Sequence, residues 1–135
     1  MIREASVDDA ERIAYLLGEL GFSRSAEQVC DQLQHMPGMV LVALHAELVV
    51  GVASLNIMQV LHRPQAVGRV SALVVDAKVR GQGIGRALLN AAEVLLRSRG
   101  CGMLEITSNF QLESAHAFYR AQNYQETSYR FKKDL

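Results

Sequence analysis

One stretch limits the fold of this chain more than any other, VVDAKVRGQGIGRALL at positions 74–89. Its β-branched start predicts a strand that ends at Asp76, and the apolar spacing that follows the turn predicts a helix. Between the two, glycines alternate at positions 81, 83 and 85, with an arginine on each side. A glycine-dense turn between a strand and a helix is typical of backbone that approaches a ligand closely.

Composition restricts the classes of protein that such a turn can belong to. The chain has 135 residues, half of them apolar, with 14 basic and 14 acidic side chains. This length predicts one domain over residues 1–135 with a proper core. The neutral charge favours no nucleic-acid partner, and no apolar stretch is long enough to span a membrane. The acidic start is no signal peptide, and Cys30 and Cys101 stand in no metal or redox pattern, so we expect a reduced, cytoplasmic protein.

Hydrophobic spacing and turn signals predict the element order β-α-α-β-β-β-α-β-α-β. Helices are expected from the capping boxes at Ser6 and Ser25, from Ile84 to just before Gly100, and at 112–122. Strands are expected at residues 2–5, 39–44, 48–61, 67–75 and 103–108, with a final strand or hairpin at 123–134. Consecutive central strands favour antiparallel pairing, whereas the strand–helix–strand unit demands a parallel pair. The expected fold is therefore a mixed sheet in an α/β or α+β domain.

The glycine turn has the features of an anion site. The N-terminus of a helix carries unpaired N–H groups and the positive end of the helix dipole. Arg80 and Arg86 flank the turn and can pair with phosphate oxygens, so a phosphate compound is the expected ligand. The Walker and dinucleotide spacings both fail, because Gly85 is followed by Arg86-Ala87 and no register reads GxGxxG. A glycine-rich turn without a ligand is the alternative.

The spacing Arg80-x-x-Gly83-x-Gly85 resembles the acetyl-CoA signature of the GNAT acetyltransferase superfamily, and the element order resembles its acyl-CoA N-acyltransferase fold. The segment ESAHAFYRAQNY, together with Asn109 just before it, resembles the superfamily's second cofactor segment. The matching residues within the segment are Ala115, Phe118 and Tyr119. The resemblance implies acetyl-CoA as cofactor. It places the pantetheine arm along Leu73, Val74 and Val75, and the pyrophosphate on the amides of Gly81, Gln82, Gly83, Ile84, Gly85 and Arg86.

The C-terminal part carries a narrower resemblance. NFQLESAHAFYRAQNYQETSYRFKKDL, residues 109–135, is similar to the tail of aminoalkylphosphonate acetyltransferases, which implies a small-molecule amine as acceptor. Asn123 stands where the superfamily pattern has Gly, and Asn also suits the left-handed position after a helix, so we expect the cap to be kept. An exposed terminal YRFKK strand can pair with a second copy, which makes a homodimer an expectation.

Acetyl transfer needs a neutral amine, a polarised thioester carbonyl and a proton for the leaving thiolate. The resemblance implies that Tyr119 is the general acid; the alternative is a packed aromatic residue beside Phe118. Asn109 is a candidate to bind the pantetheine or position the amine, or else an ordinary turn residue. A backbone N–H near Val75 is expected to polarise the carbonyl.

The strand before the turn provides no residue that would act as the general base. The strand VGRVSALVVD has no carboxylate before Asp76, although many members of the superfamily carry a Glu on this strand. His116 is the leading candidate because imidazole changes charge near neutral pH; His62 and Glu113 are weaker ones. The alternatives are ordinary surface or packing roles for these residues, and deprotonation of the amine in bulk water. The four histidines show no metal spacing, so no metal site is expected.

Two features of the sequence bear on the acceptor. Residues 21–38 and 61–66 are expected to wall the acceptor site, and Arg69, if it faces the cleft, favours an acceptor that carries an anion.

The leading hypothesis for the function is an acetyl-CoA-dependent N-acetyltransferase that acts on a small primary amine by direct transfer. The alternatives are a CoA-binding regulatory or interaction module without catalysis, and an unrelated binder of phosphate ligands.

Overall fold

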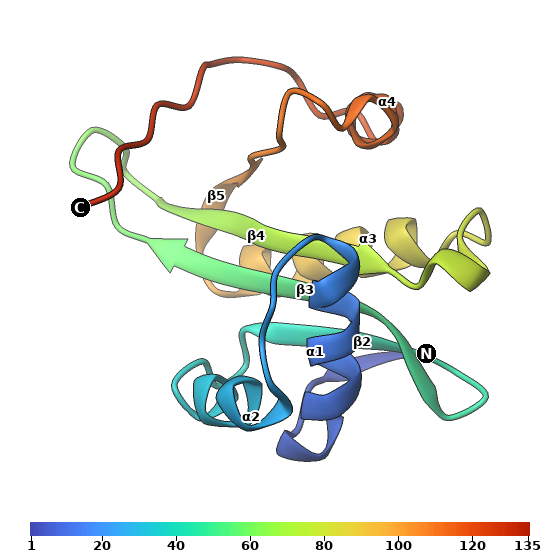
Figure 1. The fold of residues 1–135 in the computed structure, drawn as a ribbon. Helices are drawn as coiled ribbons and strands as arrows, with labels where there is room; N and C mark the ends of the chain where they lie inside the picture. The colour runs from blue at the N-terminus through green and yellow to red at the C-terminus, as the bar shows by residue number, and fades with distance from the viewer. The chain divides into compact units, whose positions relative to one another are not determined.

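The computed structural model describes residues 1–135, which form a mixed five-stranded sheet with helices (Figure 1). The strands, in spatial order, are β1 Ile2–Glu4, β2 Val40–His45, β3 Leu48–Met58, β4 Ala66–Val75 and β5 Cys101–Ile106. The helices are α1 Ala10–Glu19, α2 Ala26–Gln34, α3 Ile84–Ser98 and α4 Glu113–Ala121, with 3-10 turns η1 Val7–Asp9 and η2 Ala77–Val79. None of the helices has the length and apolar character needed to cross a membrane.

The chain divides into two compact units. The first, residues 1–105, contains α1, α2, α3 and almost all of the sheet; the second, residues 106–135, contains α4. Strands β1 to β4 pair antiparallel, each with the next. The antiparallel pairing expected for the central strands is therefore confirmed, as is the mixed α/β fold.

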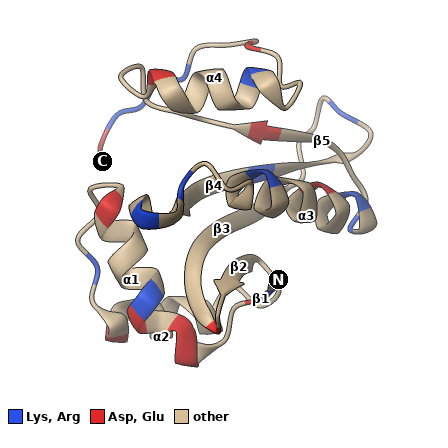
Figure 2. Ribbon diagram, turned by 90° about the vertical axis from the view of Figure 1, so that its right-hand side faces the viewer, with Lys and Arg blue, Asp and Glu red and all other residues tan.

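In the first unit the sheet lies between helices (Figure 1). On one face, Val52 and Val74 pack with Ile13 and Leu16 of α1. On the other face, a Cβ added to Gly68 would lie only 2.6 Å from the Leu96 side chain of α3, so the helix packs directly on the strand backbone. Strands β2 and β3 carry no charged residue at all (Figure 2), as their position in the middle of the core requires. Each fully buried leucine contributes about 1.5–3 kcal/mol of transfer free energy.

A β-bulge changes the side of the sheet that β4 presents. Ser54 pairs with Ala72 and Leu55 with Val70, so Ser71 is an extra residue on β4, and its Oγ donates to the Ser54 carbonyl at 3.2 Å. Before the bulge, Gly68 faces α3; after it, Ala72 and Val74 face α1 and α2. Strict alternation would have kept these even-numbered positions on one face.

The locally encoded elements agree well with expectation. Capping boxes start η1 at Ser6 and α2 at Ser25, where Ser25 Oγ accepts from the Gln28 N–H at 3.0 Å. Two boundaries differ. Strand β3 ends at residue 58 instead of 61, because Leu61 is fully exposed in the loop, and β5 occupies 101–106 instead of 103–108, because the chain extends directly after left-handed Gly100.

The final strand expected at 123–134 is wrong, since no strand follows α4. Of its three aromatic residues, Tyr124 packs against Tyr119, whereas Tyr129 and Phe131 are 80% and 91% exposed. The remaining side chains of the segment are mostly charged or polar, so the segment has no apolar face that would hold it on a sheet. Pairing of two copies through such a strand is therefore not expected.

Candidate functional site

The glycine turn joins η2 to α3 with two left-handed residues. Gly81 has φ +79° and Gly83 has φ +81°, and Gly83 is the N-cap of α3. A Cβ added to either glycine would meet no atom within 4 Å. The glycines are therefore required by the backbone conformation, and the space above that backbone is open.

This open backbone presents an array of hydrogen-bond donors. None of the N–H groups of residues 81–86 donates to an acceptor in the protein. The first paired one belongs to Ala87, which donates to the Gly83 carbonyl at 3.0 Å. Unpaired donors at the positive end of the α3 dipole form a site suited to an anion.

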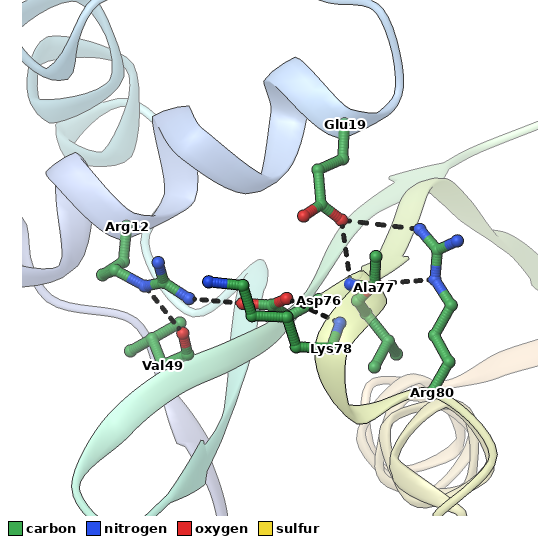
Figure 3. Close-up of polar contacts among 8 residues, drawn as sticks. Arg12, Glu19, Val49, Asp76, Ala77, Lys78 and Arg80 are labelled. Atoms are coloured by element: carbon green, nitrogen blue, oxygen red, sulfur yellow. Dashed lines mark hydrogen bonds and ion pairs between the residues drawn. The ribbon is translucent and has the colours of Figure 1, made fainter.

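A buried ion pair holds the entry to the turn (Figure 3). The Asp76 side chain is 7% exposed and accepts from Arg12 Nη2 at 2.9 Å and from the Lys78 N–H at 3.0 Å. Arg12 Nε also donates to the Val49 carbonyl at 3.0 Å. The Lys78 N–H and then Arg12 hold the pKa of Asp76 below its ordinary value of 3.8. Asp76 is thus an ionised structural group, not a proton acceptor.

A second acidic residue, Glu19 at the end of α1, also contacts this loop. Glu19 Oε2 accepts from the Ala77 N–H at 3.2 Å and from Arg80 Nη2 at 3.4 Å (Figure 3). Arg80 Nε donates to the Val75 carbonyl at 3.0 Å. Arg80, expected to bind phosphate, therefore braces the turn in this structure. Arg86 is exposed and forms no ion pair, which leaves it as the cation with a free guanidinium beside the donor array.

The strand before the turn contributes three of the expected cofactor residues. Val74 pairs with Val52 and is 4% exposed, so its side chain belongs to the core under α1. Leu73 and Val75 are half-buried and lie on the opposite face, by the alternation from Val74. Of these three residues, only Leu73 and Val75 therefore have side chains that a cofactor could reach, together with the strand backbone.

In the second unit, Asn109 and His116 close the turn before α4. Asn109 Oδ1 accepts from the Gln111 N–H at 3.1 Å, and the Asn109 carbonyl lies 2.8 Å from His116 Nε2. A hydrogen bond to a carbonyl needs the proton on Nε2, which leaves Nδ1 of a neutral His116 as the basic nitrogen. The structure brings these two predicted residues together, with the Asn109 side chain occupied as a turn cap.

Tyr119 lies in a small group of aromatic rings in the same unit. Its ring makes edge-to-face contacts with Phe118, at 5.5 Å between centroids, and with Tyr124, at 6.3 Å. Burial raises the pKa of Tyr119 above its ordinary value of 10.0. The phenol is therefore protonated at neutral pH and can act as a proton donor. Ala115 lies one turn earlier on α4 and is half-buried.

The end of α4 confirms the expectation for Asn123. Its φ is +69°, and its N–H donates to the Arg120 carbonyl at 3.0 Å. The Tyr124 N–H donates to the Tyr119 carbonyl at 3.0 Å, which completes a Schellman motif. Asparagine thus supplies the left-handed cap in place of glycine.

A pocket of about 130 Å³ lies in the first unit between α1, α2 and the sheet, and most of it was not foreseen from the sequence. It is called the α1–α2 pocket below and is lined by Ile13, Leu17, Arg24, Val29, Gln32, Leu33, Met36, Val40, Val52, Ser54 and Ala72. Residues of segment 21–38 line this pocket and residues 61–66 do not, while the lining from α1 was not foreseen; that the two segments wall an acceptor site stays a prediction. No group of three or more His, Cys, Asp or Glu side chains lies close enough to hold a metal ion.

Comparison with known proteins agrees with this fold. A transcriptional regulator from Bacillus halodurans C-125 superimposes with a TM-score of 0.91 at 21% identity, over 100% of this chain and 99% of that chain. An acetyltransferase from Trypanosoma brucei gives 0.83 at 27% identity, over 100% and 99%. An aminoglycoside N-acetyltransferase in complex with CoA gives 0.86 at 15% identity, over 100% and 93%. No curated protein matches the chain.

The family comparison is more specific than these likenesses of fold. The model of the acetyltransferase (GNAT) family matches residues 7–124, which include the glycine turn and α4. Members of this family use acetyl-CoA. The chain therefore belongs to the GNAT family and is an N-acetyltransferase of the acetyl-CoA-dependent class.

Proposed function

We propose that this protein moves the acetyl group of acetyl-CoA to a primary amine of a small molecule by direct transfer, with Tyr119 as general acid. The observation that carries the proposal is the array of unpaired N–H groups over residues 81–86 at the start of α3. Such an array suits the two phosphates in the pyrophosphate of CoA. The free guanidinium of Arg86 adds a cation next to it.

The reaction follows from these groups. The neutral amine nitrogen attacks the thioester carbonyl carbon, a backbone N–H of β4 near Val75 polarises the carbonyl oxygen, and the C–S bond breaks. The departing thiolate takes the phenolic proton of Tyr119. The attacking nitrogen loses one proton to a base. The raised pKa of Tyr119 supports its part, because it keeps the proton available up to alkaline pH.

The base is the open element of this mechanism. Asp76 is the first carboxylate after β4, but Arg12 and the Lys78 N–H keep it ionised and engaged. His116 stays the leading candidate, through Nδ1, because its Nε2 is held by the Asn109 carbonyl. An alkylammonium has a pKa near 10.4, so only about four molecules in ten thousand are neutral at pH 7. We expect kcat/KM to rise steeply with pH, as this fraction increases.

A small acceptor is favoured over a protein N-terminus by the size of the α1–α2 pocket and by the resemblance of residues 109–135 to aminoalkylphosphonate acetyltransferases. The second candidate function is a CoA-binding regulatory module without catalysis. It is favoured by the lack of a carboxylate on β4 and by the engagement of Asp76.

Two measurements on the intact chain separate the candidates. Calorimetry with CoA tests the donor site, and thiol release from acetyl-CoA with a panel of amines, amino acids, polyamines, aminoglycosides, aminoalkylphosphonates and peptides tests transfer. Gly83→Asp is expected to raise the Kd for CoA at least about tenfold, because it places a carboxylate in the anion site. Gly100→Asp is the matched control, since Gly100 is also left-handed and open but lies at the other end of α3.

Binding without turnover of any amine would favour the regulatory module. An absence of CoA binding would remove the proposal, and equal effects of the two aspartate variants would remove the assignment of the phosphate site to residues 81–86.

A further inference from the structure

The lining of the α1–α2 pocket has an unusual balance of chemistry. Eight of its eleven residues are apolar and none is acidic. The apolar residues come from both helices, from the loop after α2 and from three strands, and they are Ile13, Leu17, Val29, Leu33, Met36, Val40, Val52 and Ala72. Each methylene that a ligand buried among them would strengthen binding about fourfold.

The polar part of the lining consists of Arg24, Gln32 and Ser54. Arg24 forms no ion pair, in contrast to Arg3 and Arg12, whose guanidinium groups bind Asp9 and Asp76. Ser54 Oγ lies 3.2 Å from Ser71 Oγ, so the two hydroxyls share a hydrogen bond and Ser54 presents a neutral polar group to the pocket. The pocket therefore offers one cation and neutral hydrogen-bonding groups, but no counter-ion for a cation.

The β-bulge connects this pocket to the strand of the donor site. Ala72 follows the extra residue Ser71 directly, and the bulge turns its side chain toward α1 and α2. Three residues later the same strand reaches Val75, in the stretch proposed to hold the pantetheine arm. A ligand in the pocket thus lies against the strand along which the acetyl group is proposed to arrive.

We infer that the acceptor is a monoamine with an apolar carbon skeleton whose far end is anionic or neutral, and that polyamines and other polycations are poor substrates. This inference rests on the proposed acetyl transfer. A second ammonium group in the pocket would lose water without gaining a carboxylate and would meet Arg24. A carboxylate at the same place would gain a charged hydrogen bond.

A matched series of five-carbon amines tests the inference on the intact enzyme. 5-Aminopentanoate, pentylamine and cadaverine share one chain and end in a carboxylate, a methyl group and an ammonium. With acetyl-CoA saturating and thiol release as readout, we expect kcat/KM for cadaverine to be at least about tenfold below that for pentylamine. We expect 5-aminopentanoate to equal or exceed pentylamine.

Variants of the pocket connect the preference to named residues. Arg24→Glu should reverse the order of 5-aminopentanoate and cadaverine, whereas Arg97→Glu, an exposed arginine on α3 outside the pocket, should leave the order unchanged. Ala72→Leu should lower kcat/KM for pentylamine at least about tenfold by filling the pocket, at an unchanged Kd for CoA, which also shows that the variant is folded.

The outcomes separate this inference from the function on which it rests. Acetylation of cadaverine as efficient as that of pentylamine, or of aminoglycosides or peptides only, would overturn the inference and leave acetyl transfer standing. The same substrate order in Arg24→Glu and wild type would overturn the role of Arg24. CoA binding without turnover of any amine would overturn the proposed function itself.

Discussion

The turn at residues 76–86 and the helical segment at 109–124 are shaped by contacts of different range. The turn is held by ion pairs that span long stretches of sequence, Arg12 with Asp76 and Glu19 with Arg80, 64 and 61 residues apart. Hydrogen bonds at the two ends of α4, such as those of His116 with the Asn109 carbonyl and of the Tyr124 N–H with the Tyr119 carbonyl, join residues seven and five positions apart. The donor site thus depends on the packing of the whole first unit, and the segment with the proposed acid depends on its own caps and rings.

This difference predicts two kinds of mutational effect. Changes around the turn should alter the global stability of the first unit together with CoA binding. Changes on α4 should alter turnover more than global stability, because α4 buries none of its residues completely. The following predictions test this separation.

The largest effect is expected for Tyr119→Phe. Loss of the phenolic proton should lower kcat about 10²–10⁴-fold, the usual contribution of a general acid, while the Kd for CoA stays close to that of the wild type. Thiol-release kinetics and calorimetry measure the two quantities. Tyr129→Phe serves as control because Tyr129 is 80% exposed. Full activity of Tyr119→Phe would remove the general-acid role.

The next largest expected effect is a loss of stability of the first unit at acid pH. Asp76, through the Lys78 N–H and Arg12, and Asp9, through Arg3, have pKa values held below 3.8 in the folded chain. Because the folded chain binds these protons more weakly than the unfolded chain, the stabilisation is complete above about pH 4 and is lost as the pH falls through the lowered values. Urea midpoints between pH 6 and 2 measure it. The Asp9→Asn/Asp76→Asn variant should show a flatter profile, and a profile as steep as that of the wild type would contradict this account.

A smaller effect is expected from substitutions at two residues with a left-handed backbone, Gly83 and Asn123. Gly83→Ala should cost about 1–2 kcal/mol, because alanine is strained at φ +81°, and should weaken CoA binding. Asn123→Gly should cost nothing or stabilise slightly, because glycine suits φ +69° at least as well as asparagine. Urea denaturation gives both values. Equal losses from the two changes would show that the two turns do not differ in their demands on the backbone.

The smallest effect is expected at the surface of the second unit, residues 106–135. Arg120 Nη2 lies 3.0 Å from Glu126 Oε2, and the two side chains are 59% and 79% exposed. Glu126→Gln should change the free energy of unfolding by less than about 1 kcal/mol, and added salt should remove even that difference. A larger loss would mean that this pair does more than an ordinary surface pair.

The local features of this fold were open to prediction from the sequence because their interactions are short. The capping boxes at Ser6 and Ser25, the glycine turn and the cap at Asn123 each involve residues within a few positions of one another. Their side chains act on the nearest backbone groups, whatever the rest of the chain does. The same short-range view failed at 123–134, because a local sequence does not make a strand without a neighbouring strand to pair with.

The sequence alone determined the order of the elements as far as α4, the donor array at 81–86 and the family resemblance. Tertiary structure decided that Asp76 binds Arg12, that Arg80 braces the turn, and that the bulge at Ser71 turns Ala72 toward a pocket. Those features depend on which distant strands and helices meet and in what register. A pattern with a period of two or of 3.6 residues says which side chains share a face, but not what lies across from that face.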